Sequence, residues 1–239
     1  MSDVRHTSRV QTFKRWVRTA WQVVWSDMCR FYAWRNLLRL AAGLVVGALL
    51  ANLPLDQQVR DWYRAKVHAD TSGTLAFVAK QFGEIRIVAA CSVGAALIGG
   101  AAAANPAGAA VGAWGTQMLR ALAVAAPPQL LGQRLLGSGR PSDLLDHGSR
   151  WRCFRRDKGI SGHAFIGSLP FLVAAGMSAN PVAQTALYVC SGMTALSRID
   201  SDSHYLSQAL LGWWLAFLAV RVVRASRQAN ARGNGTPMA

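Results

Sequence analysis

The chain has 239 residues and a formal net charge of +15, and only 15% of its residues are charged whereas 52% are hydrophobic. Soluble domains carry about 25% charged residues, so this composition argues against an ordinary soluble protein. The basic excess is typical of membrane-protein loops and of contact with anionic lipids. The sequence has no continuous basic stripe on a soluble domain, so it does not indicate a nucleic-acid partner.

Residues 1–37 form a basic N-terminal segment in which apolar side chains recur at helical spacing, at Phe13, Val17, Trp21, Val24, Met28 and Phe31. A basic helix with one apolar face lies in the plane of a membrane surface, so we expect an amphipathic interfacial helix here. The alternative is a helix that packs on the rest of the protein. The first long apolar run begins too late for a secretory signal peptide.

Four windows without a charged side chain follow, at 40–55, 87–119, 164–197 and 205–220. A membrane-spanning helix needs about 20 mostly apolar residues, so the second and third windows are too long for one span and suit two. Each of these has an Asn-Pro pair near its middle, Asn105-Pro106 and Asn180-Pro181. Because proline disfavours helix in the residue before it, we interpret each window as a tight helical hairpin.

The windows predict an all-α integral membrane bundle of six transmembrane helices, at about 38–55, 87–104, 107–132, 162–179, 182–198 and 205–223. The bundle forms one domain, residues 38–223, and the polar tail 224–239 is expected to be disordered. The third span contains Arg120, which has to reach the interface or find a partner because charge inside lipid is costly. A soluble all-α protein with buried helices is the alternative.

Two polar segments lie between the spans. Residues 56–86 are expected to form an amphipathic connector outside the bilayer, and 133–161 form a loop rich in Arg and Lys. If the N-terminus and the arginines after the last span are cytoplasmic, this loop faces the other side and breaks the positive-inside trend. Either the topology is inverted or the loop is basic for a functional reason, and we favour the second interpretation.

Three short polar segments border the predicted spans: Gln133–Pro141, Ile160–His163 and Ser197–His204. One straight helix over 164–197 would separate the last two segments by about 50 Å. A reversal at Asn180-Pro181 instead places all three segments on one membrane face. The sequence therefore predicts a shared polar pocket at the lipid–water boundary.

The residue types in these segments suit the binding and transfer of a phosphate; they are Arg140, Ser161, Gly162, His163, Arg198 and His204. The two arginines carry planar guanidinium groups that pair with phosphate oxygens. The serine and glycine at a helix start offer N–H groups and a hydroxyl to an anion. The two histidines can supply a nucleophile and a general acid. No metal or cofactor is required, and the four cysteines contain no Cys-x-x-Cys pair, so neither a zinc site nor a disulfide framework is expected.

These residues and their spacing resemble the type 2 phosphatidic acid phosphatase family, the lipid phosphate phosphatases related to vanadium haloperoxidases. That family carries Lys-x6-Arg-Pro, Pro-Ser-Gly-His and Ser-Arg-x5-His-x3-Asp, and its six-helix membrane form places all three motifs at one face. The resemblance covers roughly residues 38–223, and the matching residues are Arg140-Pro141, Ser161-Gly162-His163, and Ser197-Arg198 with His204.

The resemblance implies a division of labour among the matching residues. It implies that His204 attacks phosphorus to form a phosphohistidine, that His163 protonates the leaving alcohol, and that water then hydrolyses the intermediate. It also implies that Arg140, Arg198 and the Ser161-Gly162 backbone hold the transition-state oxygens.

Two departures from the family motifs concern the site. Gln133 stands where the family has lysine, with Arg134 beside it as a substitute. Gln208 stands where the family has the aspartate that orients the nucleophilic histidine. Loss of such a carboxylate costs about 10⁴-fold in a serine-protease triad. Gln208 could hold His204 through its amide oxygen, without charge, or Asp200 or Asp202 could fold back and supply a carboxylate.

The sequence therefore predicts a membrane phosphatase that acts on a lipid phosphate or diphosphate. The candidate substrates are phosphatidic acid, phosphatidylglycerol phosphate, a polyprenyl diphosphate and the lipid A phosphates. We expect a bacterial inner-membrane protein whose site faces the periplasm, with membrane lipids and no nucleic acid as partners. A phosphotransferase that uses the same intermediate and a non-catalytic protein that binds lipid phosphates are the alternatives.

Overall fold

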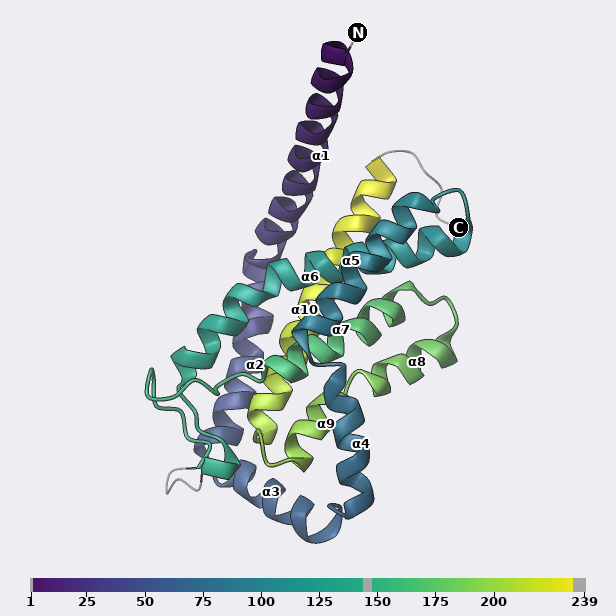
Figure 1. Ribbon diagram of the computed structural model, residues 1–239. Coiled ribbons are helices and arrows are strands. Elements are labelled where there is room, and N and C mark those ends of the chain that lie inside the picture. The colour runs from purple at the N-terminus through teal and green to yellow at the C-terminus, as the bar shows by residue number, and fades with distance from the viewer. Residues whose placement is uncertain (1, 144–147, 234–239) are drawn as a thin grey trace.

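The computed structural model describes residues 2–143 and 148–233, and all regular elements in these ranges are helices (Figure 1). In chain order they are α1 (Ser2–Phe31), α2 (Trp34–Asn52), α3 (Leu55–Lys66), α4 (Asp70–Gln81), α5 (Ile85–Ala101), α6 (Pro106–Leu136), the 3-10 helix η1 (Pro141–Asp143), α7 (Gly162–Met177), α8 (Pro181–Cys190), α9 (Met193–Asp200) and α10 (Leu206–Gly233). The predicted all-α class is confirmed for the described residues.

The number of membrane spans differs from the prediction. Two helices are long and apolar enough to cross a membrane: α2, with a mean hydropathy of 1.3, and the Leu206–Ala229 part of α10, with 1.6. Helices α4 and α5 are long and apolar enough to cross a membrane only when they are taken together, as a pair bent by 48°. The six predicted spans are therefore not confirmed, and two to three candidate spans are found in the described ranges.

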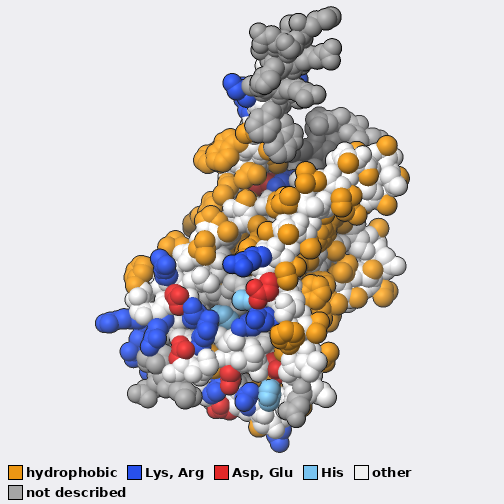
Figure 2. Space-filling view, viewed as in Figure 1, with side chains coloured by type: hydrophobic (Ala, Val, Ile, Leu, Met, Phe, Trp, Pro, Cys, Tyr) orange, Lys and Arg blue, Asp and Glu red, His pale blue; other side chains and the backbone are white. Residues whose placement is uncertain are grey.

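Length and helix breaks explain part of this difference. Helix α7 is apolar but has 16 residues, so it extends about 24 Å, less than the roughly 30 Å of a bilayer's hydrocarbon core. The segment predicted as a fifth span, 182–198, is broken between α8 and α9. Figure 2 shows hydrophobic side chains over much of the surface along the helices, whereas charged side chains gather at the end where α3 lies.

Both predicted hairpins are present. Asn105 accepts a hydrogen bond from the N–H of Ala107 at 2.9 Å and Pro106 occupies the first turn of α6, so the Asn-Pro pair starts the helix. Helices α5 and α6 then pack side by side, and Gly99 and Gly112 bring the two backbones so close that a Cβ on either glycine would overlap the other.

The second hairpin joins α7 and α8. The side chain of Asn180 accepts hydrogen bonds from the N–H groups of Val182 and Ala183, at 2.9 and 3.1 Å, and Pro181 again stands in the first turn. The chain therefore reverses at the predicted position and returns through α8 and α9 toward the start of α7 (Figure 1).

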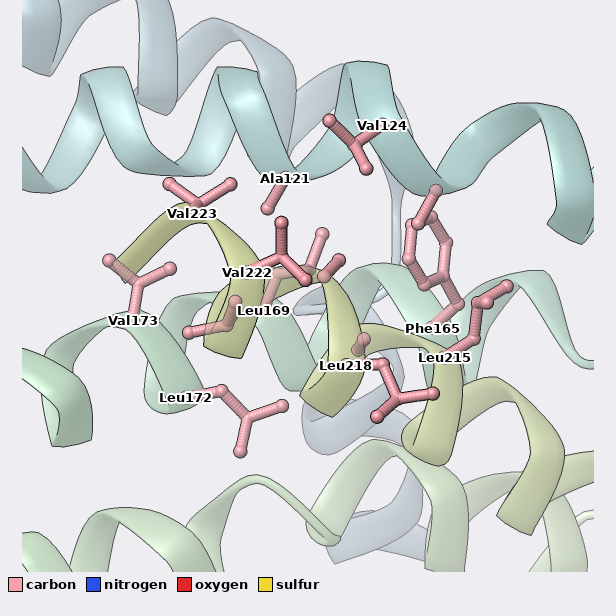
Figure 3. Packing of buried hydrophobic residues seen from close by; sticks show 14 of the residues in the cluster. Ala121, Val124, Phe165, Leu169, Leu172, Val173, Leu215, Leu218, Val222 and Val223 are labelled. Carbon is pink, nitrogen blue, oxygen red and sulfur yellow. The ribbon is translucent and has the colours of Figure 1, made fainter. Parts of the chain in front are cut away.

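Helix α10 is the central element of the core and packs mainly against α7, α2 and α6. Figure 3 shows part of this packing, and the side chains labelled there come from three helices: Ala121 and Val124 from α6, Phe165, Leu169, Leu172 and Val173 from α7, and Leu215, Leu218, Val222 and Val223 from α10. This packing fixes the N-terminal end of α10 next to the N-terminal end of α7, where the predicted motifs lie.

Two side chains near the C-terminal end of α1 are buried in the bundle. Asp27 and Phe31 are fully buried, and Asp27 forms a two-pronged ion pair with Arg120 of α6 at 2.7 and 2.9 Å. Asp27 is therefore the partner of Arg120, which is one of the two outcomes expected from the sequence. The rest of α1 projects from the body of the molecule (Figure 1).

Helix α10 also continues beyond the predicted start of the disordered tail, as far as Gly233. Residues 224–233 contain Arg, Ala and Gln but no proline, and adding residues to an existing helix needs no new nucleation. The tail prediction therefore does not hold for these residues, and 234–239 lie outside the described ranges.

Candidate active site

Backbone hydrogen bonds join the three predicted motif segments at one end of the bundle. The N–H of Ser161 donates to the carbonyl of Gln208 at 3.0 Å, which ties the start of α7 to α10. The N–H of His204 donates to the carbonyl of Arg198 at 3.0 Å. The segment that carries Arg140 joins them because Ser142 N–H, two residues along, donates to the carbonyl of residue 202 at 3.2 Å. Figure 2 shows histidine side chains among Lys and Arg side chains in this region.

Gly137, in the left-handed backbone conformation, turns the segment Gln133–Pro141 toward the site. Helix α6 ends at Gly137, which has a φ of 64°, and a Cβ there would overlap the carbonyl oxygen of Arg152. The chain then turns through Ser138 and Gly139 to Arg140, whose N–H donates to the carboxylate of Asp143 at 3.0 Å.

Gln208 holds the imidazole of His204. The distance from Gln208 Oε1 to His204 Nδ1 is 2.8 Å, and the same oxygen accepts a hydrogen bond from the N–H of Tyr205 at 3.1 Å. On its other side, Gln208 Nε2 donates to the carbonyl of Gly139 at 2.6 Å. A backbone N–H can only donate and a carbonyl can only accept, so these two neighbours fix which end of the amide faces His204. His204 Nδ1 must therefore carry the hydrogen, and Nε2 keeps its lone pair.

Ser138 reinforces this orientation. Its hydroxyl donates to the carbonyl of Ser149 at 2.7 Å, so its oxygen is left to accept the second hydrogen of Gln208 Nε2, also at 2.7 Å. Ser138 and Gln208 are both fully buried. The result is a chain of hydrogen bonds with a single direction, from His204 through Gln208 and Ser138 to the backbone of Ser149.

His204 is held in its neutral form. Burial lowers the pKa of His204 to about 3; the hydrogen bond to Gln208 opposes this shift, and the positive charges of Arg198 and Arg140 add to it. At neutral pH the imidazole is therefore uncharged, with a lone pair on Nε2 that is available for attack on phosphorus.

Arg140 and Arg198 have unused donors at the site. The Nε atoms of both guanidinium groups are buried and have no hydrogen-bond partner in the described part of the chain, and Arg198 is only 9% exposed. A buried donor without a partner costs about 1–3 kcal/mol, and more when it is charged. An anion bound between the two arginines would remove this cost.

His163 and Ser161 stand at the start of α7. His163 Nε2 lies 3.2 Å from a carboxylate oxygen of Glu84, the residue before α5. The Ser161 hydroxyl accepts a hydrogen bond from the N–H of Ala164 at 3.2 Å and so caps the helix. Because the N–H of Ser161 is already bonded to Gln208, the predicted anion-binding N–H groups reduce to those that follow it at the helix start, which have no intrahelical partner.

The predicted lysine substitutes lie in different environments. The amide nitrogen of Gln133 is 3.5 Å from the position that a Cβ on Gly162 would occupy, so Gln133 faces the start of α7 and the site. Arg134 is exposed. The positive charge that the family lysine supplies therefore has no equivalent at position 133.

Asp202, the alternative orienting residue, points away from His204. Its carboxylate accepts two hydrogen bonds from Arg60, at 2.9 and 3.0 Å, and the hydrogen bonding to Arg60 is the main cause that lowers the pKa of Asp202. The residue has a φ of 48°, which aspartate tolerates better than most side chains. Gln208 is thus the side chain that contacts His204 Nδ1.

Three residues in or near the site were not predicted from the sequence: Ser138, Glu84 and Arg60. Ser138 lies inside the first motif segment, where it reads as an ordinary loop serine. Glu84 is one of few acidic residues at the edge of an apolar window, which is a weak signal for a functional role. Arg60 is separated from Asp202 by 142 positions, so sequence spacing gives no indication of their pairing.

Comparison with known proteins agrees with the motif geometry. No curated protein and no solved structure matches the chain. The family model described as PAP2 superfamily matches residues 114–232, which include all three motif segments and the four residues Arg140, His163, Arg198 and His204. The chain belongs to the PAP2 superfamily.

Proposed function

We propose that this protein is a membrane phosphatase that hydrolyses a lipid phosphate or diphosphate through a phosphohistidine at His204. Membership of the PAP2 superfamily supports phosphatase-type activity in general. The observation that carries the finer proposal is the 2.8 Å contact between Gln208 and His204 Nδ1. It leaves Nε2 free beside two arginines whose Nε atoms have no partner in the described ranges.

In the first step, Nε2 of His204 donates its lone pair to phosphorus, and the bond between phosphorus and the leaving oxygen breaks. His163 gives a proton to that oxygen, so the leaving group departs as an alcohol, or as a lipid monophosphate when the substrate is a diphosphate. Glu84 holds the proton donor by accepting a hydrogen bond from the protonated imidazole.

In the second step, His163 removes a proton from a water molecule that attacks the phosphorus. The phosphorus–nitrogen bond breaks, inorganic phosphate leaves, and both histidines return to their starting forms. Arg140 and Arg198 bind the phosphoryl oxygens throughout and stabilise the charge that develops on them. Gln208 keeps the hydrogen on Nδ1, so that the lone pair stays on Nε2.

The proposed location is a bacterial inner membrane with the site on the periplasmic side. Arg221, Arg224 and Arg227 lie toward the C-terminal end of α10, whereas His204 lies just before its N-terminal end. The positive-inside rule favours a cytoplasmic position for the arginines, and a helix that crosses the membrane then carries the site to the opposite face.

The test is an assay of phosphate release by the full-length protein in detergent, with the four candidate lipid phosphates and no added acceptor. We expect release from at least one of them, and we expect His204→Ala to reduce it to background. Arg18→Ala, at an exposed position of α1, is the control for a lost surface charge. Equal rates in His204→Ala and the wild type would refute the proposal, release only with an added acceptor would favour the transferase, and binding without turnover would favour a non-catalytic protein.

A further inference from the structure

A cavity of about 490 Å³ with several charged lining residues lies beside the candidate active site, between α3, α4 and α9. Arg198 belongs to both, because it lines this cavity and its charge acts on His204. The other basic residues that line the cavity are Arg64, His68 and Lys80, whereas His163 and His204 do not line it. The cavity thus meets the candidate active site at Arg198.

The two carboxylates in this cavity are already occupied. Asp202 receives both of its close hydrogen bonds from Arg60. Asp200 is contacted by the hydroxyls of Tyr63 and Ser72, at 3.1 and 2.7 Å, and by His68 Nδ1 at 3.1 Å. The charge of Asp202 is therefore paired with a cation, and the carboxylate of Asp200 is occupied by three polar contacts.

Arg64 and Lys80, two basic side chains of the cavity, form only long or exposed ion pairs. Arg64 is 43% exposed and its Nε lies 3.8 Å from Asp202, and Lys80 is 38% exposed and lies 3.5 Å from Glu84. Exposed pairs of this kind contribute little, so both cations can turn toward an anion in the cavity. The contact of Asp200 with His68 Nδ1 leaves the other ring nitrogen of His68 to a ligand.

An apolar groove of about 400 Å³ continues from this cavity on the other side of α4. The two share Ala76, Ser197 and Asp200 as lining residues. The groove is otherwise lined mostly by hydrophobic side chains of α4, α9 and the turn after α4, among them Leu75, Val78, Phe82, Met193 and Leu196. The order of compartments is therefore active site, basic cavity, apolar groove.

We propose that the basic cavity binds the second phosphate of a lipid diphosphate, the one that His204 does not attack. A lipid diphosphate has the same order of groups as the compartments: the distal phosphate at His204, the proximal phosphate in the cavity and the hydrocarbon chain in the groove. This assignment rests on the proposed function and narrows it to a substrate class. A glycerolipid with a single phosphate would place neutral ester groups beside Arg64 and Lys80, and its binding would gain nothing from their charge.

The experiment compares farnesyl diphosphate with farnesyl monophosphate, two short lipids with one chain, using the full-length protein in detergent. We expect kcat/KM to be higher for the diphosphate. In Arg64→Ala the ratio of the two kcat/KM values falls about tenfold, the loss of one charge-assisted hydrogen bond, and Lys80→Ala acts in the same direction. Arg18→Ala, in α1, is the matched control and leaves the ratio as in the wild type. Arg64 is partly exposed, so the folding of its variant is not at risk.

A binding measurement separates this inference from the proposed function. Farnesyl methylenediphosphonate and farnesyl phosphonate cannot be hydrolysed at the bridge, and calorimetry with His204→Ala reports their affinities without any turnover. We expect the diphosphonate to bind about tenfold more tightly and Arg64→Ala to abolish that preference. Equal affinities, or a preference that survives in Arg64→Ala, would overturn the assignment even if hydrolysis is found. Competition by inorganic pyrophosphate as strong as that by the lipid diphosphonate would overturn the assignment of the chain to the groove.

Discussion

Replacing Gln208 by leucine tests whether an uncharged amide does the work of the family's orienting aspartate. The side chain is fully buried, so leucine keeps most of the packing. It removes the acceptor of His204 Nδ1 and of the Tyr205 N–H, and it removes the donor to Gly139. The hydrogen of the neutral imidazole is then free to move to Nε2, where water or the substrate phosphate can accept it, and that tautomer cannot attack phosphorus.

The size of the expected effect follows from the kind of bond that is lost. A buried group left without its partner costs about 1–3 kcal/mol, which corresponds to a loss in rate of roughly 5–160-fold if the whole cost falls on the transition state. Removing a charged orienting carboxylate costs about 10⁴-fold in a serine-protease triad. Because the amide carries no charge, we expect Gln208→Leu to lie in the lower range, well above the background rate of His204→Ala. Ser138→Ala, which removes one of the two acceptors of the amide N–H₂ group, should lose less than Gln208→Leu.

The assay is phosphate release combined with the nitrogen NMR spectrum of histidine-labelled protein, because ring nitrogen shifts distinguish the two tautomers. We expect His204 to show a protonated Nδ1 in the wild type and a mixture, or a protonated Nε2, in Gln208→Leu. Gln117→Leu is the matched control, since Gln117 is also a buried glutamine but bonds only to the carbonyl of Ala113. A Gln208→Leu protein with full activity and an unchanged tautomer would refute the reasoning.

Three further predictions concern leaving-group chemistry, pH and the buried ion pair. His163→Ala should lose at least tenfold more activity on an alkyl phosphate than on p-nitrophenyl phosphate, whose leaving group needs no proton, and equal losses would contradict the role of His163 as acid. Because burial lowers the pKa of His204 to about 3 while the unfolded value is about 6.5, the unfolded chain binds more protons between these values. Stability is therefore fully present above about pH 6.5 and is lost as the pH falls toward 3, so melting in detergent should show a pH dependence that is weaker in His204→Asn. Asp27→Ala and Arg120→Ala should each destabilise the fold by about 3–5 kcal/mol in equilibrium unfolding, and the double variant by less than the sum, because each single change leaves a buried charge alone.

The elements that local chemistry controls could be predicted from the sequence. Both Asn-Pro reversals lie at the predicted positions because asparagine caps and proline fits the first turn, whatever the rest of the chain does. The three motif segments meet because those reversals leave no other end of the bundle for them. The number of spans could not be predicted in the same way, since it depends on where a long apolar stretch breaks, as between α8 and α9.

Contacts between distant segments account for the rest of the site. The role of Gln208 depends on Gly139 and Ser138, which lie about 70 positions away in the sequence. The choice between Gln208 and Asp202 as the residue nearest His204 could not be made before Arg60 was placed, because Arg60 engages the aspartate carboxylate. Which of several possible acceptors bonds to His204 depends on residues that are distant in the sequence, so the sequence alone does not decide it.

The pairing of Asp27 with Arg120 has a consequence for how the protein is made. Ribosomes synthesise the carboxylate 93 positions before its cation, so during translation Asp27 exists for a time without a counterion. A buried carboxylate without a counterion is costly. The C-terminal end of α1 therefore gains its ion pair only after α6 has been made, so the first helix completes its packing later than its place in the chain suggests.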